Sequence, residues 1–296
     1  MQFFLYLPQM RLSFDRIAET AQAAEAAGFA GIAGMDHMAP PLADAQPMYG
    51  AMITNTWIAA RTERLTVASL VLCDAFRHPA VLAQEAVSLD HASGGRFELG
   101  IGWGSYLPDF TRFGVEPQTP AARVARLRET LTVLKGLWAG EAVTYQGEYH
   151  QLAGAVQAPT PLGRIPIVIG GAGPKTLKLV AEFADWCNLD VRYLDRLEGE
   201  ALQTLRGQIG DARISAQQMV AYVPEGADRQ AVAHAALRRF GRSAPVVGSG
   251  AELVDHFGRL AERGVERIYA WFCDFAPPET LAGFGETVIR ALGSEG

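Results

Sequence analysis

The sequence predicts an α/β fold, a (β/α)8 TIM barrel in which one domain spans residues 1–296. Three observations support this prediction. Strand-like and helix-like segments alternate from the N-terminus, and about eight strand-like segments can be counted along the chain. No linker, low-complexity tract or short repeat divides the sequence. A length of 296 residues is ordinary for one such barrel.

In the first third of the chain, short apolar runs alternate with segments of helical periodicity. Strands are expected at residues 3–7, 29–35, 65–73 and 96–101. Helices are expected at residues 14–27, 52–62 and 79–93. Ser13 or Asp15 can cap the first helix, and Gly28 ends it. The near-continuous apolar run of residues 65–73 is typical of a strand that is buried on both faces.

The rest of the chain continues this alternation after one interruption. A helix at residues 121–138 precedes an expected hairpin, residues 143–145 and 148–150, inside an insertion at about residues 140–163. Further strands are expected at residues 165–169, 186–190, 219–223 and 268–272, and further helices at residues 174–183, 194–207, 228–240, 251–263 and 280–292. The loops of residues 38–47 and 105–120 are expected at the barrel mouth together with the insertion, where they set the substrate.

The composition is that of a soluble globular protein, with 49% hydrophobic and 20% charged residues. A formal charge of −6 without a basic cluster argues against nucleic acid as a partner. The apolar run of residues 3–8 is too short for a signal sequence or a membrane span, so we expect a cytoplasmic protein without a membrane anchor. Three widely spaced cysteines and six histidines without ligand spacing argue against disulfides and a structural metal.

The stretch from Arg77 to Gly104 reads as one helix and one buried strand, and its last glycines let the backbone approach a bulky ligand at the strand's end. This stretch, with Asp109-Phe110 and Phe113-Gly114 beyond it, resembles the bacterial luciferase-like oxidoreductase family, and the likeness extends in outline over nearly the whole chain. The family includes the luciferase α subunit, FMN-dependent monooxygenases and enzymes that use the deazaflavin coenzyme F420. The resemblance implies an oxidoreductase on a luciferase-like barrel.

His37 follows Asp36 at the end of the second expected strand. In a barrel this end faces the active site, and an imidazole there can transfer protons near neutral pH. From position alone, the alternative is that Asp36 caps the next segment and His37 makes a buried structural hydrogen bond. The resemblance implies the catalytic role for His37, with Asp36 beside the cofactor and able to orient the imidazole.

The turn Gly170-Gly171-Ala172-Gly173-Pro174-Lys175-Thr176 lies between an expected strand and a helix that Pro174 opens. Exposed amides, the helix dipole and the Thr176 hydroxyl can form a phosphate site, although an ordinary connecting turn has the same composition. The resemblance implies that Gly170, Gly171, Ala172, Gly173 and Thr176 bind the cofactor phosphate.

Two further segments are expected to contact the cofactor because of the resemblance. Related enzymes often have a non-prolyl cis peptide at the place of Ser69-Leu70, where it forms a bulge behind the flavin ring; the alternative is a plain buried strand. Gly102, Trp103 and Gly104 lie at the end of the next strand. Trp103 takes the place of a luciferase arginine that helps to hold FMN phosphate, and it either stacks on a cofactor or packs under the following loop. Ser105 takes the place of a catalytic glutamate in the F420-dependent glucose-6-phosphate dehydrogenases.

Some residues are interpreted as scaffold. Arg77 is expected to order the barrel wall, His78 to cap the helix that follows it, and Arg96 to pair with Asp90. Tyr106, Tyr145 and Tyr149 lie on expected loops, where they either line a substrate mouth or simply pack.

The sequence therefore predicts an oxidoreductase that uses coenzyme F420 for hydride transfer to or from a small organic molecule. The alternative is an FMN-dependent monooxygenase that uses reduced FMN and oxygen. A less favoured third possibility is a non-catalytic binding subunit, against which His37 argues. A homodimer is possible because relatives often dimerise through barrel helices.

Overall fold

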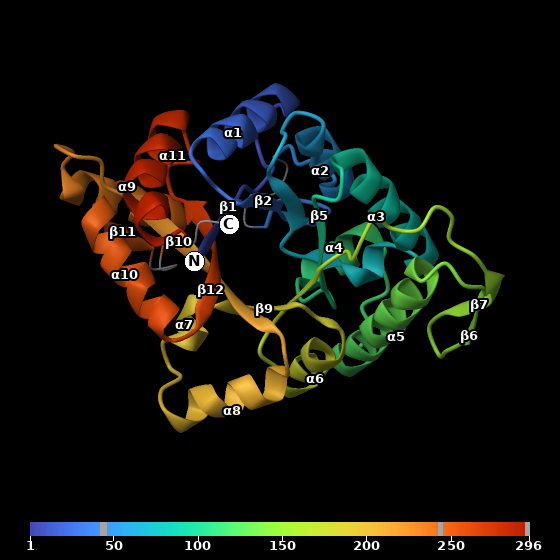
Figure 1. The fold of residues 1–296 in the computed structure, drawn as a ribbon. Coiled ribbons are helices and arrows are strands. Elements are labelled where there is room, and N and C mark those ends of the chain that lie inside the picture. Colours follow the sequence, from blue (N-terminus) through green and yellow to red (C-terminus); the bar gives the residue numbers. More distant parts are fainter. Residues whose placement is uncertain (42–45, 242–244, 294–296) are drawn as a thin grey trace.

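The computed structural model of the protein describes residues 1–41, 46–241 and 245–293. Residues 42–45, which belong to the first expected mouth loop, lie outside the described part. Within the described ranges, no helix combines the length and apolarity that crossing a membrane requires. The amino group of Met1 donates a hydrogen bond to the Leu292 carbonyl at 2.8 Å, so the two ends of the described chain lie together (Figure 1).

Eight parallel strands close into a barrel, which confirms the predicted fold. They pair in the order β1 (Gln2–Tyr6), β2 (Gly31–Gly34), β3 (Thr66–Ser69), β5 (Phe97–Gly102), β8 (Ile167–Gly170), β9 (Trp186–Asp190), β10 (Arg213–Tyr222) and β12 (Val265–Phe272). β12 pairs with β1, and the register Phe3↔Ile268 closes the barrel. Two short strands extend this sheet, because β4 (Leu72–Cys73) pairs with β5 and β11 (Val246–Gly248) pairs with β10.

Helices surround the strands in Figure 1. The longer ones are α1 (Phe14–Ala26), α2 (Ala51–Ala59), α3 (Pro79–Ser93), α5 (Pro120–Trp138), α6 (Pro174–Phe183), α8 (Glu200–Ile209), α9 (Arg229–Phe240) and α10 (Gly250–Glu262). Local sequence explains several of their ends. The Ser13 hydroxyl accepts from Arg16 N at the start of α1, and the imidazole of His78 accepts from Ala80 N at the start of α3, as expected. Gly94 ends α3 in the left-handed conformation.

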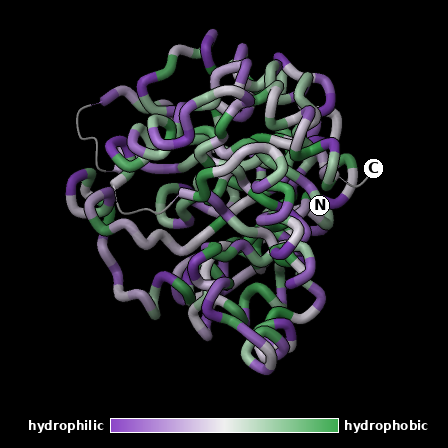
Figure 2. Tube along the Cα trace, turned by 90° about the vertical axis from the view of Figure 1, so that its left-hand side faces the viewer, coloured by the Kyte–Doolittle hydropathy of each residue, from purple (hydrophilic) through white to green (hydrophobic). Residues whose placement is uncertain are grey.

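Apolar side chains fill two shells, and hydrophobic stretches gather toward the inside of the chain trace in Figure 2. The larger shell lies between strands and helices and includes Ile17, Leu131 and Phe257, all fully buried. The smaller one fills the barrel interior with Phe4, Tyr6, Ala33, Met35, Ala68 and Tyr269. Side chains alternate between the two sides of a strand, so β1 supplies both shells: Phe3 and Leu5 lie in the larger one, and Phe4 and Tyr6 lie in the smaller one.

The N-terminal end of the barrel holds a buried ion pair. Arg267 on β12 donates to Glu98 on β5, and both side chains are 4% exposed. The guanidinium carbon of Arg267 lies 3.8 Å from the ring centroid of Trp186 and 4.0 Å from that of Phe4. Gln2 and the Tyr269 hydroxyl are further hydrogen-bond partners of the guanidinium. The pair is therefore enclosed and has several partners, as a structural charge must have.

The predicted elements agree with the structure in some segments and differ from it in others. Residues 174–183 and 186–190 are confirmed with their predicted bounds. The expected loop of residues 105–120 contains helix α4 (Leu107–Phe113), and the expected helix of residues 194–207 is two helices, α7 (Val191–Leu194) and α8. The strand β11 was missed, because three residues are too few to show a period.

Three further differences concern strands and a salt bridge. The second strand of the hairpin is Gln151–Ala155 instead of residues 148–150, because Glu129 on α5 accepts from the amides of 148–150 and holds that turn. The expected strand of residues 65–73 is divided into β3 and β4.

The expected pairing of Arg96 with Asp90 is wrong. The Arg96 guanidinium donates to four backbone carbonyls, those of Leu65, Ala59, Thr62 and Ser93. Asp90 instead accepts from Leu162 N.

Candidate active site

A cavity of 490 Å³ opens where the strands end, at the C-terminal end of the barrel. Its walls are the last residues of β1, β5 and β8, the segment between β3 and β4, β4 with the turn after it, part of β10, and the loops that follow β2 and β5. The lining residues are Tyr6, Asp36, His37, Leu70, Val71, Leu72, Cys73, Phe76, Gly102, Trp103, Gly104, Ser105, Tyr106, Asp109, Phe110, Gly170, Gly171 and Gln217. Eight residues predicted for the site therefore border one cavity: Asp36, His37, Leu70, Gly102, Trp103, Gly104, Gly170 and Gly171.

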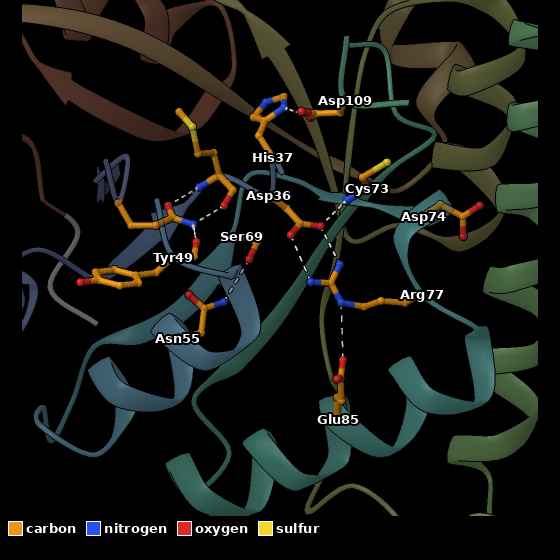
Figure 3. A network of polar contacts seen from close by, with 12 residues as sticks. Asp36, His37, Tyr49, Asn55, Ser69, Cys73, Asp74, Arg77, Glu85 and Asp109 are labelled. Carbon is orange, nitrogen blue, oxygen red and sulfur yellow. Dashed lines mark hydrogen bonds and ion pairs between the residues drawn. The ribbon is translucent and has the colours of Figure 1, made fainter. Parts of the chain in front are cut away.

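His37 is held by Asp109, a residue that the sequence did not indicate as its partner. The imidazole Nδ1 lies 2.7 Å from Asp109 Oδ2, with side-chain exposures of 27% and 3% (Figure 3). The Tyr106 ring meets the imidazole edge-on at a centroid distance of 5.3 Å. A carboxylate that accepts from Nδ1–H leaves Nε2 with its lone pair free to accept a proton. Asp109 thus orients the imidazole as the carboxylate of a catalytic triad does.

Asp36 borders the cavity, and its carboxylate faces Arg77 and not His37. Arg77 donates to the two oxygens of Asp36 at 2.6 and 3.1 Å, and Cys73 N donates at 2.9 Å (Figure 3). The expectation that Asp36 orients the imidazole is therefore wrong. Arg77 also lies 3.6 Å from Glu85, so it connects the end of β2 to α3, as expected of a scaffold residue.

A bulge between β3 and β4 forms one wall of the cavity. The Leu70–Val71 peptide bond is cis, so the expected cis peptide is present one bond beyond Ser69-Leu70. A Cβ atom on Gly100 would overlap the Ser69 carbonyl oxygen, and one on Gly102 would lie 2.8 Å from Val71 Cγ2. These glycines are needed because the bulge packs directly on β5. Ser69 itself does not border the cavity: its hydroxyl accepts from Asn55 at 3.0 Å (Figure 3).

Trp103 borders the cavity on one side and meets a buried arginine on the other. The guanidinium carbon of Arg123 lies 4.9 Å from the Trp103 ring centroid and 5.2 Å from that of Phe110, and Arg123 donates to the Gly104 carbonyl. Gly104 has a φ of +76°, and a Cβ there would lie 2.6 Å from Cys73 Sγ. Sequence reasoning missed Arg123, although a charged residue four positions before Leu127 on an apolar helix face is a signal that could have found it.

The glycine-rich turn reaches the cavity with its first two residues only. Gly170 and Gly171 border it, whereas Ala172, Gly173 and Thr176 lie beyond, and the Thr176 side chain is buried. The amide of Gly171 donates to the Asn188 carbonyl at 3.0 Å, so it is already occupied. The first turn of α6 leaves the amides of Lys175 and Thr176 without intrahelical partners. The phosphate site at this turn stays a prediction.

Other polar groups near the cavity were not predicted. Tyr6, the last residue of β1, and Gln217, within β10, both border the cavity. Burial raises the pKa of the Tyr6 hydroxyl, and a hydrogen bond with Gln217 opposes this shift. Burial also raises the pKa of the Cys73 thiol to about 12, which keeps it protonated. Of the three loop tyrosines, Tyr106 borders the cavity, Tyr145 packs against the core, and Tyr149 lies beside a separate cleft near His150.

Within the described residues, no group of three or more histidine, cysteine, aspartate or glutamate side chains is placed to hold a metal ion. The chemistry that the cavity itself offers is proton transfer at His37, next to glycine-lined walls that can receive a flat ring.

The family model of the luciferase-like monooxygenases matches residues 1–270, and the chain belongs to that family. Among its curated relatives are F420-dependent glucose-6-phosphate dehydrogenases. The protein of Microbacterium testaceum is 38% identical over 152 residues, which are 51% of this chain and 45% of that relative. The protein of Mycobacterium avium is 36% identical over 133 residues, 44% of this chain and 39% of the relative. The matches thus span less than half the length of these relatives.

Solved structures confirm the fold over almost the whole chain. An F420-dependent secondary alcohol dehydrogenase in complex with an F420-acetone adduct has a TM-score of 0.83 at 18% identity and covers 98% of both chains. An EDTA monooxygenase from Chelativorans sp. BNC1 has a TM-score of 0.82 at 13% identity and covers 98% of this chain and 93% of its own. At these identities the likeness concerns the fold alone.

Proposed function

We propose that the protein is an oxidoreductase that binds coenzyme F420 in the cavity at the C-terminal end of the barrel and transfers hydride between the deazaflavin and a small organic substrate. The observation that carries this proposal is the His37–Asp109 pair, with 2.7 Å between Nδ1 and Oδ2, on the wall of a glycine-lined cavity. The curated relatives named above support the choice of cofactor, although each match covers less than half of the relative.

The residues present fit a flat tricyclic cofactor. The volume of 490 Å³ is within the usual range for small-molecule sites, and the bulge at Leu70–Val71 offers an apolar surface. Gly102 lets the bulge and the end of β5 approach each other, because a Cβ on Gly102 would lie 2.8 Å from Val71 Cγ2. In this proposal Leu70 and Val71 would hold the ring, and the turn from Gly170 to Thr176 would hold the phosphate.

The chain's own residues orient the reactants and move the proton. His37 Nε2 accepts the hydroxyl proton of an alcohol as its carbon loses hydride, or returns that proton in the reverse direction. Asp109 stabilises the imidazolium that forms, and its burial keeps the imidazole in one orientation. Bound F420 supplies the hydride acceptor or donor. Trp103, Leu70 and Val71 shield the reacting atoms from water.

Titration with F420 and with FMN tests this proposal. Trp103 borders the cavity, so binding of the ring should quench tryptophan fluorescence in a saturable way, and Trp103→Phe should reduce the quenching without abolishing binding. The proposal predicts tighter binding of F420 than of FMN. Tighter binding of FMN, with oxygen uptake by the reduced flavin, would make the protein a monooxygenase instead; binding of neither would indicate a non-catalytic subunit.

A further inference from the structure

The described residues that border the cavity include no lysine or arginine. The acidic residues at the wall are Asp36 and Asp109. Two arginines lie close behind it, and both are already engaged. Arg77 is held by Asp36 and lies near Glu85, and Arg123 lies behind Trp103 and donates to the Gly104 carbonyl. A substrate phosphate or carboxylate would therefore lose water without gaining a positive partner.

The side of the cavity away from the glycine-rich turn has one neutral polar pair. Tyr6 ends β1, which neighbours β2, and His37 follows β2 by three residues. Gln217 on β10 is within hydrogen-bonding reach of the Tyr6 hydroxyl. Burial favours the protonated form of that hydroxyl, so it keeps a proton that it can donate to a substrate oxygen.

The surroundings of Tyr6 are aromatic and apolar. The Tyr6 ring meets Trp271 edge-on at 5.3 Å, and Phe240 meets Trp271 at 5.4 Å, both between centroids. Tyr6 also borders a small recess lined by Met10, Leu12 and Phe275 among others. Apolar side chains also border the cavity itself, among them Leu70, Val71 and Phe110. Walls of this kind favour a substrate with hydrocarbon substituents over a highly hydrated sugar.

We propose that the substrate is an uncharged alcohol or the corresponding carbonyl compound with apolar substituents, whose oxygen is contacted by His37 and the Tyr6 hydroxyl. In the oxidative direction the carbinol C–H bond breaks and its hydride passes to the oxidised deazaflavin. The O–H proton passes to His37, the carbon–oxygen double bond forms, and a solvent proton completes the reduced cofactor. This inference rests on the proposed F420 chemistry, and it differs from the sugar phosphate in the names of the curated relatives.

A matched pair of substrates tests the charge discrimination. Isopropanol and lactate share a methyl carbinol and differ only in a methyl or a carboxylate group. With oxidised F420 and the full chain, kcat/KM should favour isopropanol and cyclohexanol over lactate and glucose-6-phosphate by more than about tenfold, the order expected from an unmatched charge near a carboxylate.

Isopropanol and lactate also differ in intrinsic reactivity, so a variant with an added positive charge is compared with the wild type on the same two substrates. Gln217→Lys places a cation at the cavity wall and should shift the ratio of kcat/KM toward lactate by about tenfold or more. Gln203→Lys adds the same charge on the exposed face of α8 and should leave the ratio unchanged.

Tyr6→Phe tests the hydrogen bond to the substrate oxygen. Loss of one such bond should raise KM for the neutral alcohols about fivefold to tenfold, with the F420 dissociation constant unchanged. Tyr222→Phe, which removes a hydroxyl near Thr287 outside the cavity, is the control.

Three results would overturn the inference: wild-type preference for lactate or glucose-6-phosphate, no turnover of any neutral alcohol or ketone by protein that binds F420, or an unchanged substrate ratio in folded Gln217→Lys. Failure of F420 to bind, seen in the fluorescence titration, would instead overturn the proposed function.

Discussion

The two ends of the barrel each hold a buried carboxylate against a basic side chain, but in different surroundings. At the N-terminal end, Arg267 and Glu98 are both 4% exposed, with Trp186 and Phe4 against the guanidinium. At the C-terminal end, Asp109 is just as buried, but its partner His37 is 27% exposed and borders the cavity. The enclosed pair can only support the fold, whereas the open pair can exchange a proton with a ligand. Mutations at the two ends should therefore separate stability from chemistry.

The largest predicted effect is the loss of turnover in His37→Ala, at the His37–Asp109 pair. General acid or base catalysis typically contributes about 10²- to 10⁴-fold in rate, so turnover should fall by that factor. The affinity for F420 should change little, and the loss in melting temperature should be smaller than that of Arg267→Met, because the His37 side chain is 27% exposed. Turnover per folded molecule and calorimetry provide the two readouts. A lower melting temperature with intact turnover would return His37 to a structural role.

Arg267→Met should produce the largest loss of stability. Removing one partner of a buried pair leaves an uncompensated charge on Glu98, which costs about 3–5 kcal/mol of unfolding free energy. Urea unfolding measures this loss. Arg213→Met is the matched control, since Arg213 also stacks on Trp186 at 3.8 Å but is exposed, and it should cost less than about 1 kcal/mol. Equal losses of unfolding free energy in the two variants would contradict the distinction between a buried and an exposed arginine.

A cluster behind the cavity should give stability a characteristic pH dependence. Burial raises the pKa of Asp74 to about 6, against the effects of Thr130 and Arg126. Burial, with Arg126 and His78, lowers the pKa of His150 to about 4, against Glu129. The Asp74 contribution is present below the unfolded pKa of about 3.9 and is lost as pH rises through 6. The His150 contribution is present above the unfolded pKa of about 6.5 and is lost as pH falls through 4.

In the wild-type protein the titrations of Asp74 and His150 change the stability in opposite directions as the pH changes. A variant that removes one of the two groups should therefore show the pH dependence that the other one causes. His150→Gln should lose stability as pH rises from 4 to 6, on the order of 2–3 kcal/mol at full titration. Asp74→Asn should instead lose stability as pH falls through the same window. Chemical unfolding at a series of pH values measures both slopes. The same slope in both variants would be inconsistent with this assignment.

Gly173→Asp should produce the smallest effect, and it tests the phosphate turn. Gly173 is the N-cap of α6 with φ −69° and ψ 144°, a conformation that aspartate adopts readily. The helix should therefore keep its stability, while the added charge should weaken F420 binding by about tenfold. Gly173→Asn has the same shape without the charge and should bind like the wild type. Unchanged affinity in Gly173→Asp would move the phosphate elsewhere.

These comparisons show which parts of the molecule sequence patterns could predict. Hydrophobic periodicity and the positions of the glycines were enough to predict the barrel, the cavity walls and the place of His37. Each of these depends on local spacing or on the end of a strand. Asp109 could not be recognised as the partner of His37, since 72 residues separate them and Asp36 was the nearer carboxylate in sequence. Tyr6 and Gln217 were missed for the same reason: only closure of the barrel brings β1, β2 and β10 to one cavity.

The most direct measurement follows the hydride itself. The full chain is incubated with F420H2 that carries deuterium at the transferring ring carbon and with a panel of uncharged ketones, while dissolved oxygen is recorded. The proposed chemistry predicts one deuterium at the carbinol carbon of the product alcohol and no consumption of oxygen. Stoichiometric oxygen uptake with reduced FMN, together with no turnover of the labelled F420H2, would contradict it.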